Sequence, residues 1–278
     1  MRQFFQCGRF DYQLDKRPLV MGILNVTPDS FSDGGRYQGL EFAISRAEEM
    51  VADGVDMIDV GGESTRPGSP SVSVQEELGR VMPALYALRG LDKPLSVDTC
   101  KPEVMREAII AGADMINDIN GFRAPGALEA VANSDCGLCV MHMQGTPQHM
   151  QQQPVYTDVV REVTDFLRER VEALVAAGVA RDRICVDPGF GFGKTVEHNY
   201  SLLRHLDQIE RELGLPVLAG LSRKSMIGAV TGRPVEQRLA GSVAAALAAL
   251  AHGAKIVRVH DVAETVDAFK VWRAATID

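Results

Sequence analysis

Eight short apolar runs recur along the chain, and a helix-like pattern follows each of them. The runs cover residues 19–24, 56–60, 95–98, 115–118, 138–142, 184–187, 217–220 and 256–259. They are rich in Val, Ile and Leu and lack polar alternation, as strands buried on both faces of a parallel sheet do. Eight such strand–helix units in 278 residues predict a (β/α)8 TIM barrel. An open, doubly wound sheet is the rival fold, because periodicity alone does not separate the two.

Start and stop signals bound the segments between the runs. We expect helices over residues 40–54, 74–88, 101–111, 126–132, 158–177, 196–213, 235–252 and 263–274. Ser73 is placed to cap one helix, and Pro102 stands near the first turn of the next, where proline is tolerated. Gly54 and Gly178 end two others, as helix-terminating glycines do.

The residues before the first run alternate in polarity and contain Gly8 (FFQCGRFDYQL, residues 4–14). They predict a short N-terminal β-hairpin that closes the bottom of the barrel. No linker, low-complexity tract or charge run divides the chain, so we expect one domain over residues 1–278. Glycines and prolines cluster at 27–39, 61–70 and 144–154, which we expect to be long loops after the first, second and fifth strands.

Composition excludes several classes of protein. The formal net charge is −8, from 29 Lys and Arg against 37 Asp and Glu, whereas nucleic-acid binders usually carry a basic patch. The chain has no apolar run long enough to span a membrane and no signal-peptide core at its N-terminus. Its five cysteines are irregularly spaced, which favours reduced thiols and a cytoplasmic location. We expect Cys136 and Cys139 to be small apolar residues entering a buried strand rather than metal or redox residues.

Polar residues follow nearly every apolar run. In strand order these residues are Asn25, then Glu63 to Arg66, Asp98, Asn117 with Asp118, Met141 with His142, Asp187, Ser222 to Lys224, and Arg258 with His260. Because the carboxyl ends of the strands surround the active site of a TIM-barrel enzyme, we expect these groups to converge on one pocket.

The expected pocket combines two kinds of chemistry. Asp98, Asn117 and Asp187 offer acceptors and an amide, which suit a flat heterocycle with several N–H groups. Structural caps or salt bridges are the alternative roles for these three residues. A second set supplies cations and donors that suit a phosphate-bearing substrate: Arg66, Lys224, Arg258 and His260. Lys224 alternatively suits a Schiff base, and Arg258 could lay its guanidinium flat on an aromatic ligand.

The glycine-rich segment GFGFGK (189–194) does not fit a nucleotide-binding loop. A GxxxxGK[ST] loop ending here needs a glycine at 188, where the chain has Pro188. We expect the glycines to let a loop pass close to a ligand, with Phe190 and Phe192 as apolar walls. His142 and His149 do not have the spacing of a zinc site.

Several motifs give the chain a family resemblance. They are MGILNVTPDSFSDGG (21–35), DVGGESTRPG (59–68), SVDT (96–99), INDI (116–119), DPGFGFGK (187–194), LSRKS (221–225) and RVHDV (258–262). Their order and identity resemble the dihydropteroate synthases over essentially the whole chain. The resemblance implies a barrel transferase of folate biosynthesis. Such an enzyme condenses 6-hydroxymethyl-7,8-dihydropterin diphosphate with p-aminobenzoate, releasing 7,8-dihydropteroate and diphosphate. It further implies Mg²⁺, a homodimer and inhibition by sulfonamides.

The resemblance also implies a role for each matching position. The implied pterin-binding residues are Asp98, Asn117, Asp187, Lys224 and Arg258, with Met141 and Phe192 as apolar neighbours. The implied diphosphate or Mg²⁺ residues are Asn25, Arg66, Arg258 and His260, with Asn25 as the metal ligand. The implied p-aminobenzoate side is Thr65, Pro67 and Ser222. The implied catalytic residues are Asp98, Asp187, Lys224 and Arg258.

Two other functions are compatible with part of this pattern. A pterin-binding methyltransferase barrel, which carries methyltetrahydrofolate, would share the acidic floor. It would not need the NVTPDSFSDGG loop or a diphosphate site. A non-catalytic paralogue that keeps the barrel as a scaffold is the other alternative, and its predicted signature is loss of Asn25, Arg66, Lys224 or His260. All four are present.

Overall fold

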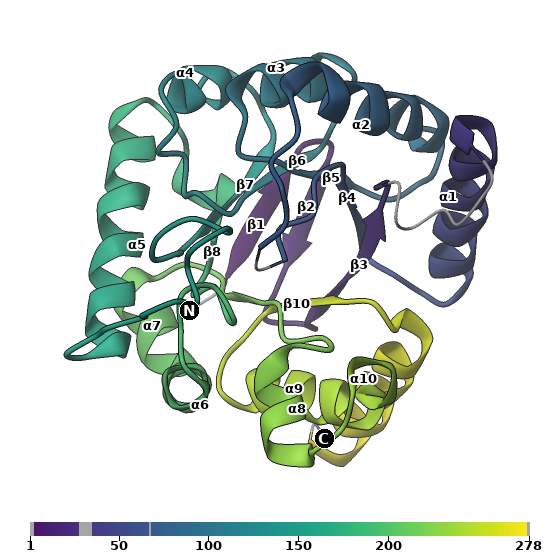
Figure 1. Ribbon diagram of the computed structural model, residues 1–278. Helices are drawn as coiled ribbons and strands as arrows, with labels where there is room; N and C mark the ends of the chain where they lie inside the picture. Colours follow the sequence, from purple (N-terminus) through teal and green to yellow (C-terminus); the bar gives the residue numbers. More distant parts are fainter. Residues whose placement is uncertain (1–2, 28–34, 67, 277–278) are drawn as a thin grey trace.

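The eight predicted runs form one parallel sheet that curls into a barrel (Figure 1). The computed structural model describes residues 3–27, 35–66 and 68–276. The barrel strands are β3 (Leu19–Asn25), β4 (Met57–Gly61), β5 (Leu95–Asp98), β6 (Met115–Asp118), β7 (Gly137–Met141), β8 (Ile184–Asp187), β9 (Leu218–Ala219) and β10 (Ile256–Val259). Their spatial order is β8-β7-β6-β5-β4-β3-β10-β9, and a parallel bridge between Val186 and Val217 joins the two ends. The barrel prediction is confirmed, and the open-sheet alternative is wrong.

Helices surround the barrel as an outer ring (Figure 1). They are α1 (Gly35–Ala52), α2 (Val74–Leu88), α3 (Pro102–Ile110), α4 (Ala127–Val131), α5 (Val159–Ala176), α6 (Val196–Arg204), α7 (Leu206–Leu213), α8 (Ser225–Thr231), α9 (Leu239–Ala251) and α10 (Val262–Thr276). The Ser73 side chain accepts from the Glu76 N–H at the start of α2, as predicted, and Asp158 caps α5 in the same way. None of the helices among the described residues is both long and apolar enough to cross a membrane.

The helix predictions differ from the structure in four places. The segment predicted as one helix over 196–213 is two helices, because His205 leaves helical geometry at φ −119° and ψ 22° between α6 and α7. The short helix α8 was not predicted. A 3₁₀ turn at Val235–Gln237 precedes α9. In addition, α1 starts at Gly35, so the end of the expected loop 27–39 is helical.

The N-terminal hairpin closes the amino-terminal end of the barrel, as predicted. Strands β1 (Phe4–Cys7) and β2 (Phe10–Gln13) pair antiparallel, and Gly8 makes their turn with φ +56°. Phe5 is fully buried in a cluster with Met57 and Met115 from the barrel interior. Gly137 lets this plug fit, because a Cβ there would lie 2.9 Å from the Phe5 ring. The opposite end of the barrel is left for the site.

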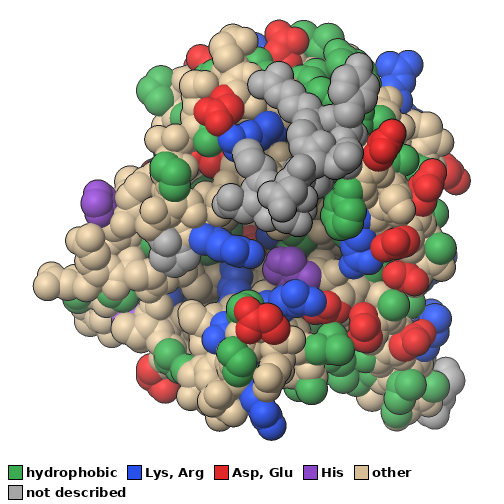
Figure 2. Space-filling model, turned by 45° about the vertical axis from the view of Figure 1, so that its right-hand side comes forward, with side chains coloured by type: hydrophobic (Ala, Val, Ile, Leu, Met, Phe, Trp, Pro, Cys, Tyr) green, Lys and Arg blue, Asp and Glu red, His purple; other side chains and the backbone are tan. Residues whose placement is uncertain are grey.

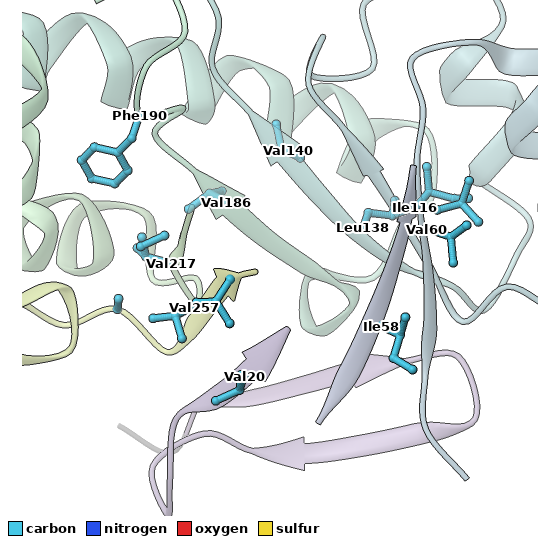
Figure 3. Close-up of a cluster of buried hydrophobic side chains, with 14 of the residues drawn as sticks. Val20, Ile58, Val60, Ile116, Leu138, Val140, Val186, Phe190, Val217 and Val257 are labelled. Atoms are coloured by element: carbon cyan, nitrogen blue, oxygen red, sulfur yellow. The ribbon is translucent and has the colours of Figure 1, made fainter. Parts of the chain in front are cut away.

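The larger core lies between the strands and the helices. Figure 3 shows part of it, with Val20, Ile58, Val140 and Val257 among the side chains that the strands contribute. Phe190 belongs to this core and has no exposed surface, so its predicted role as a wall of the pocket is wrong. The rigid layer beneath the strand ends fixes where their polar residues point.

The five cysteines are all free thiols. Four of them are buried, including Cys139 within β7 and Cys136 directly before it, which confirms their interpretation as small apolar residues entering a buried strand.

Candidate active site

Charged and polar side chains gather at the carboxyl ends of the strands. Figure 2 shows a face of the molecule where Lys and Arg side chains and a histidine surround a hollow. A pocket of about 250 Å³ opens between the loop after β4 and the loop after β7, and its lining includes Thr65, Asp98 and Asn120. The site is therefore at the end of the barrel predicted from the strand-end residues.

Arg258 joins two carboxylates at the floor of this site. Its Nε donates to Asp59 Oδ2 at 2.6 Å, and its Nη2 donates to Asp98 Oδ2 at 2.8 Å. Burial opposes the charge of Arg258, but the two carboxylates outweigh that effect and raise its pKa. Burial raises the pKa of Asp98 to about 7, with the charge of Arg258 acting against it and that of Asp59 adding to it. The Arg258 guanidinium thus pairs with two carboxylates, of which Asp59 is fully buried and Asp98 is partly exposed.

Strand register brings the rest of the floor together. Asp59 on β4 is paired with Ser96 on β5, and Asp98 on β5 is paired with Asn117 on β6. The Ser96 hydroxyl donates to Asp59 Oδ1 at 2.5 Å, and the Asn117 amide donates to Asp59 Oδ2 at 3.2 Å. Asp98 and Asn117 therefore share one wall of the barrel mouth, as predicted.

Asp187 and Lys224 form the neighbouring part of the floor. Asp187 Oδ1 accepts from the Gly189 N–H at 2.7 Å, and burial raises the pKa of this carboxyl. Lys224 Nζ donates to the Phe190 carbonyl and lies 4.7 Å from the centre of the Phe192 ring. Burial lowers the pKa of Lys224 to about 8, although Asp187 favours its charge. This half of the floor pairs an acceptor with a cation.

Apolar side chains line the site next to this pair. Met141 is 3% exposed and packs with Ile119, Met143 and Phe192. Met141 and Phe192 therefore lie together in one apolar cluster, and their implied place beside the pterin stays a prediction.

His260 and Ser222 meet at the rim. The Ser222 hydroxyl oxygen accepts from the His260 backbone N–H at 3.2 Å and lies 3.0 Å from His260 Nδ1. These two contacts hold the His260 imidazole beside the Ser222 hydroxyl. Burial lowers the pKa of His260 to about 4, so it is a neutral donor near pH 7 rather than a cation. Arg66 is exposed nearby, and its charge adds to that lowering.

Asn25 ends β3 at the mouth of the barrel. It is paired with Gly61 on β4, and its Oδ1 would lie 3.6 Å from a Cβ at Gly61. Pro67 lies outside the described residues, so the structure says nothing of its expected role.

The glycine-rich loop 189–193 approaches protein backbone rather than only a ligand. A Cβ at Gly189 would lie 1.9 Å from the His142 carbonyl oxygen, and one at Gly193 would lie 2.5 Å from the Gln144 carbonyl oxygen. Only Gly191 faces a residue of the floor, because a Cβ there would lie 3.2 Å from Lys224 Cδ. Close approach to protein backbone therefore accounts for the glycines at 189 and 193, and the expected approach of the loop to a ligand stays a prediction.

Sequence reasoning overlooked Asp59 at the site. The sequence does show a feature that points to it: Asp59 is a carboxylate inside the apolar run 56–60, and a buried carboxylate needs hydrogen-bond partners. Asp118, by contrast, is structural: its carboxylate accepts from the Asn120 and Phe122 N–H groups.

Comparison with known proteins identifies the family. Residues 21–260 match the family described as pterin binding enzyme. The dihydropteroate synthase of Neisseria meningitidis serogroup C is 51% identical over 281 residues, covering 100% of this chain and 99% of its own. The crystal structure of the Burkholderia cenocepacia dihydropteroate synthase with 7,8-dihydropteroate is 56% identical, with a TM-score of 0.90 and coverage of 99% and 96%.

The chain belongs to the dihydropteroate synthase family. A further member, the Xanthomonas albilineans enzyme with 4-aminobenzoic acid, is 51% identical, with a TM-score of 0.93 and coverage of 100% of each chain. The synthase is thus a transferase of folate biosynthesis, and the resemblance seen in its sequence is confirmed. The methyltransferase and scaffold alternatives are set aside.

Proposed function

We propose that the synthase joins 6-hydroxymethyl-7,8-dihydropterin diphosphate to p-aminobenzoate, with diphosphate leaving before the amine attacks. The observation that carries the proposed reaction is the floor itself, where Asp98, Asn117, Asp187 and Lys224 converge beside Arg258. These groups complement a flat, nitrogen-rich ring on one side and an anion on the other.

The reaction breaks the bond between the pterin methylene carbon and the diphosphate oxygen, which keeps the electron pair. The methylene cation that results is conjugated with the electron-rich pterin, and the carboxylates of Asp98 and Asp187 stabilise it electrostatically. The arylamine nitrogen then forms the new bond to carbon and loses a proton. No strong general base is needed, because the amine becomes acidic only after it has attacked.

The rim residues fit the departing anion. Arg66 and Arg258 supply positive charge, and the neutral His260 supplies an N–H that Ser222 orients. We assign p-aminobenzoate to the side of the pocket that Thr65 lines. A sulfonamide resembles p-aminobenzoate in shape and charge, so we place it on the same side.

We propose Asn25 as the protein ligand of Mg²⁺. Its amide oxygen is the kind of ligand that a hard cation takes, although no group of three or more His, Cys, Asp or Glu side chains in the described ranges could hold a metal. One neutral oxygen suits Mg²⁺ only when the substrate diphosphate supplies most of the other ligands. When bound, the ion would offset charge on the departing diphosphate.

We further propose a homodimer and a cytoplasmic location. Helix α9 consists of apolar residues, Gly241 and Ser242, and it leaves Leu239 38% exposed, which suits a contact with a second copy. The five free thiols suit a reducing compartment. Sedimentation equilibrium tests the dimer, and a mass of one chain would contradict it.

Diphosphate release tests the proposed reaction. The synthase should release diphosphate from the pterin diphosphate only when p-aminobenzoate is present, with one dihydropteroate formed per diphosphate. Arg258→Gln should abolish both products, whereas Arg233→Gln at the exposed Arg233 should not. Methyl transfer without diphosphate release would contradict the proposal.

A further inference from the structure

Asp59 holds the floor of the site together without facing the solvent. It has no exposed surface, and it accepts from Ser96 at 2.5 Å, Arg258 at 2.6 Å and Asn117 at 3.2 Å. These partners lie on three other strands, β5, β10 and β6. A buried carboxylate with three donors is fully used within the protein, so it acts on a ligand only through its partners.

The bond from Asp59 decides which way the Asn117 amide points. An ionised carboxylate can only accept hydrogen bonds, whereas an amide has a donating nitrogen and an accepting oxygen. The amide nitrogen must therefore lie toward Asp59, because the reverse orientation would set two oxygens against each other. The order of donor and acceptor that Asn117 presents to the pocket follows from this contact.

The same carboxylate retains Arg258. The side chain of Asp59 is 0% exposed and that of Asp98 is 10% exposed, although both bind the guanidinium. An incoming ligand therefore reaches Asp98 and not Asp59. When N–H groups of a ligand compete for Asp98, the bond to Asp59 keeps the guanidinium at the floor.

We propose that Asp59 is a positioning residue for pterin recognition, which fixes the Asn117 amide and keeps Arg258 in place while Asp98 turns to the ligand. The inference rests on the pterin floor assigned under the proposed function. It adds a residue whose effect reaches the pterin only through other side chains.

Exchanging the carboxylate at position 59 and the amide at position 117 tests the proposal. Asp59→Asn frees the Asn117 amide to turn and should weaken binding of 6-hydroxymethyl-7,8-dihydropterin by about tenfold or more, as expected for the loss of a buried charge-assisted contact. Asn117→Asp sets two carboxylates side by side and should weaken binding at least as much. The double variant restores one amide and one carboxylate with their roles exchanged, so it should bind the pterin more tightly than either single variant.

Asp114→Asn is the matched control. Asp114 is also a buried carboxylate paired with an arginine, Arg9, but it lies where the N-terminal hairpin closes the barrel. This variant should lose thermal stability with unchanged pterin affinity. In the Asp59 variants, the KM for p-aminobenzoate at saturating pterin should stay near the wild-type value.

A double variant that binds pterin no more tightly than Asn117→Asp overturns the proposal, and this comparison holds even if Asp59→Asn does not fold. Unchanged pterin affinity in a folded Asp59→Asn overturns it as well. Asp98→Asn, measured in parallel, separates this failure from failure of the floor assignment. If Asp98→Asn also leaves pterin affinity unchanged, the floor itself is wrongly assigned.

Discussion

Lys194 Nζ lies 2.9 Å from His142 Nδ1 at a place where both side chains are buried. The ammonium also donates to the carbonyl oxygens of Gly189 and Phe192, at 3.0 Å each. Burial lowers the pKa of His142 to about 2 and lowers that of Lys194, with Asp187 favouring the lysine charge. The pair fastens the loop 189–193 to the end of β7.

Lys194→Met should loosen this loop and weaken pterin binding. Three buried acceptors would lose their donor, which predicts a loss of roughly 3 kcal/mol or more in the free energy of unfolding. Pterin affinity should also fall, because the same loop supplies the Gly189 N–H to Asp187 and the Phe190 carbonyl to Lys224. Urea denaturation and pterin titration check both effects. Lys270→Met is the control, since Lys270 is 71% exposed, and equal losses in the two variants would contradict the prediction.

Pterin binding should strengthen as the pH rises through about 7. The raised pKa of Asp98 means that part of the carboxyl is protonated at neutral pH, and a protonated carboxyl is a poorer acceptor for N–H groups. Below that pKa, a proton competes with the ligand, so affinity should fall by up to about tenfold per pH unit. Titrations from pH 5.5 to 8.5 measure this slope. It should flatten in Asp98→Asn, and a wild-type profile without any slope would refute the prediction.

Acid should destabilise the folded protein through its buried histidines. His142 and His260 have folded pKa values of about 2 and 4, whereas an unfolded histidine titrates near about 6.5. The unfolded state then binds more protons between these values, so stability falls as the pH drops below about 6.5. The raised pKa of Asp98 acts in the opposite sense, because its contribution is lost as the pH rises toward 7. Denaturation of the wild type and His142→Gln at pH 7.5 and 5.0 should show a smaller acid loss in the variant.

Glu63→Gln should weaken p-aminobenzoate binding more than pterin binding. Glu63 accepts from the Val72 N–H at 3.2 Å and from Lys101, which also binds the buried Glu77. These contacts fix both ends of the loop that carries Thr65. We expect the KM for p-aminobenzoate to rise by about threefold to tenfold, as for the loss of one charge-assisted bond, with pterin affinity nearly unchanged. Glu76→Gln is the control, because the Glu76 carboxylate is exposed to solvent and its ion pair with Arg80 should contribute little.

Sulfonamide binding should depend on the other substrate. The arylamine side is built partly by the loop after β4, whereas the pterin floor is built on strand ends, so we expect positive coupling between them. A sulfonamide titrated into the protein alone should bind weakly, and pterin with magnesium diphosphate should tighten it. Identical affinity in the two conditions would mean that the arylamine side is already formed.

Mg²⁺ alone should bind negligibly. Asn25 contributes one neutral oxygen, and the described residues hold no cluster of metal-binding side chains around it. Calorimetry should therefore detect binding only in the presence of diphosphate. A tight Mg²⁺ site in the empty protein would be evidence against Asn25 as a lone ligand.

The barrel could be predicted from the sequence because its strands are buried on both faces. Runs such as 115–118 and 184–187 have no polar alternation to confuse with a surface strand, and each ends in a polar residue at the mouth. Helix α8 was missed because its seven residues, SMIGAVT, contain a glycine and present no polar face. Phe190 was misplaced because the sequence does not reveal which way a loop side chain turns.

The sequence predicts which residues lie at the site better than it predicts which of them contact one another. Asp98, Asn117 and Asp187 were found from their positions after strands, but the shared guanidinium of Arg258 depends on how tightly the barrel closes. Asp59 escaped notice because its neighbours in the chain are apolar and its partners come from other strands. A lone acid within such a run is the signal that would have found it.

The bond between Asp59 and Arg258 spans 199 positions of the chain. During synthesis on a ribosome, Asp59 therefore emerges long before the guanidinium that neutralises it, and a barrel lacking β10 would bury an unpaired charge. Such a partial barrel is disfavoured by several kcal/mol, on the order of the cost of breaking a buried ion pair. The contact between Asp59 and Arg258 thus disfavours closure of the nascent sheet before β10 has been made. An ordered pterin floor therefore requires that the last strand of the barrel has folded.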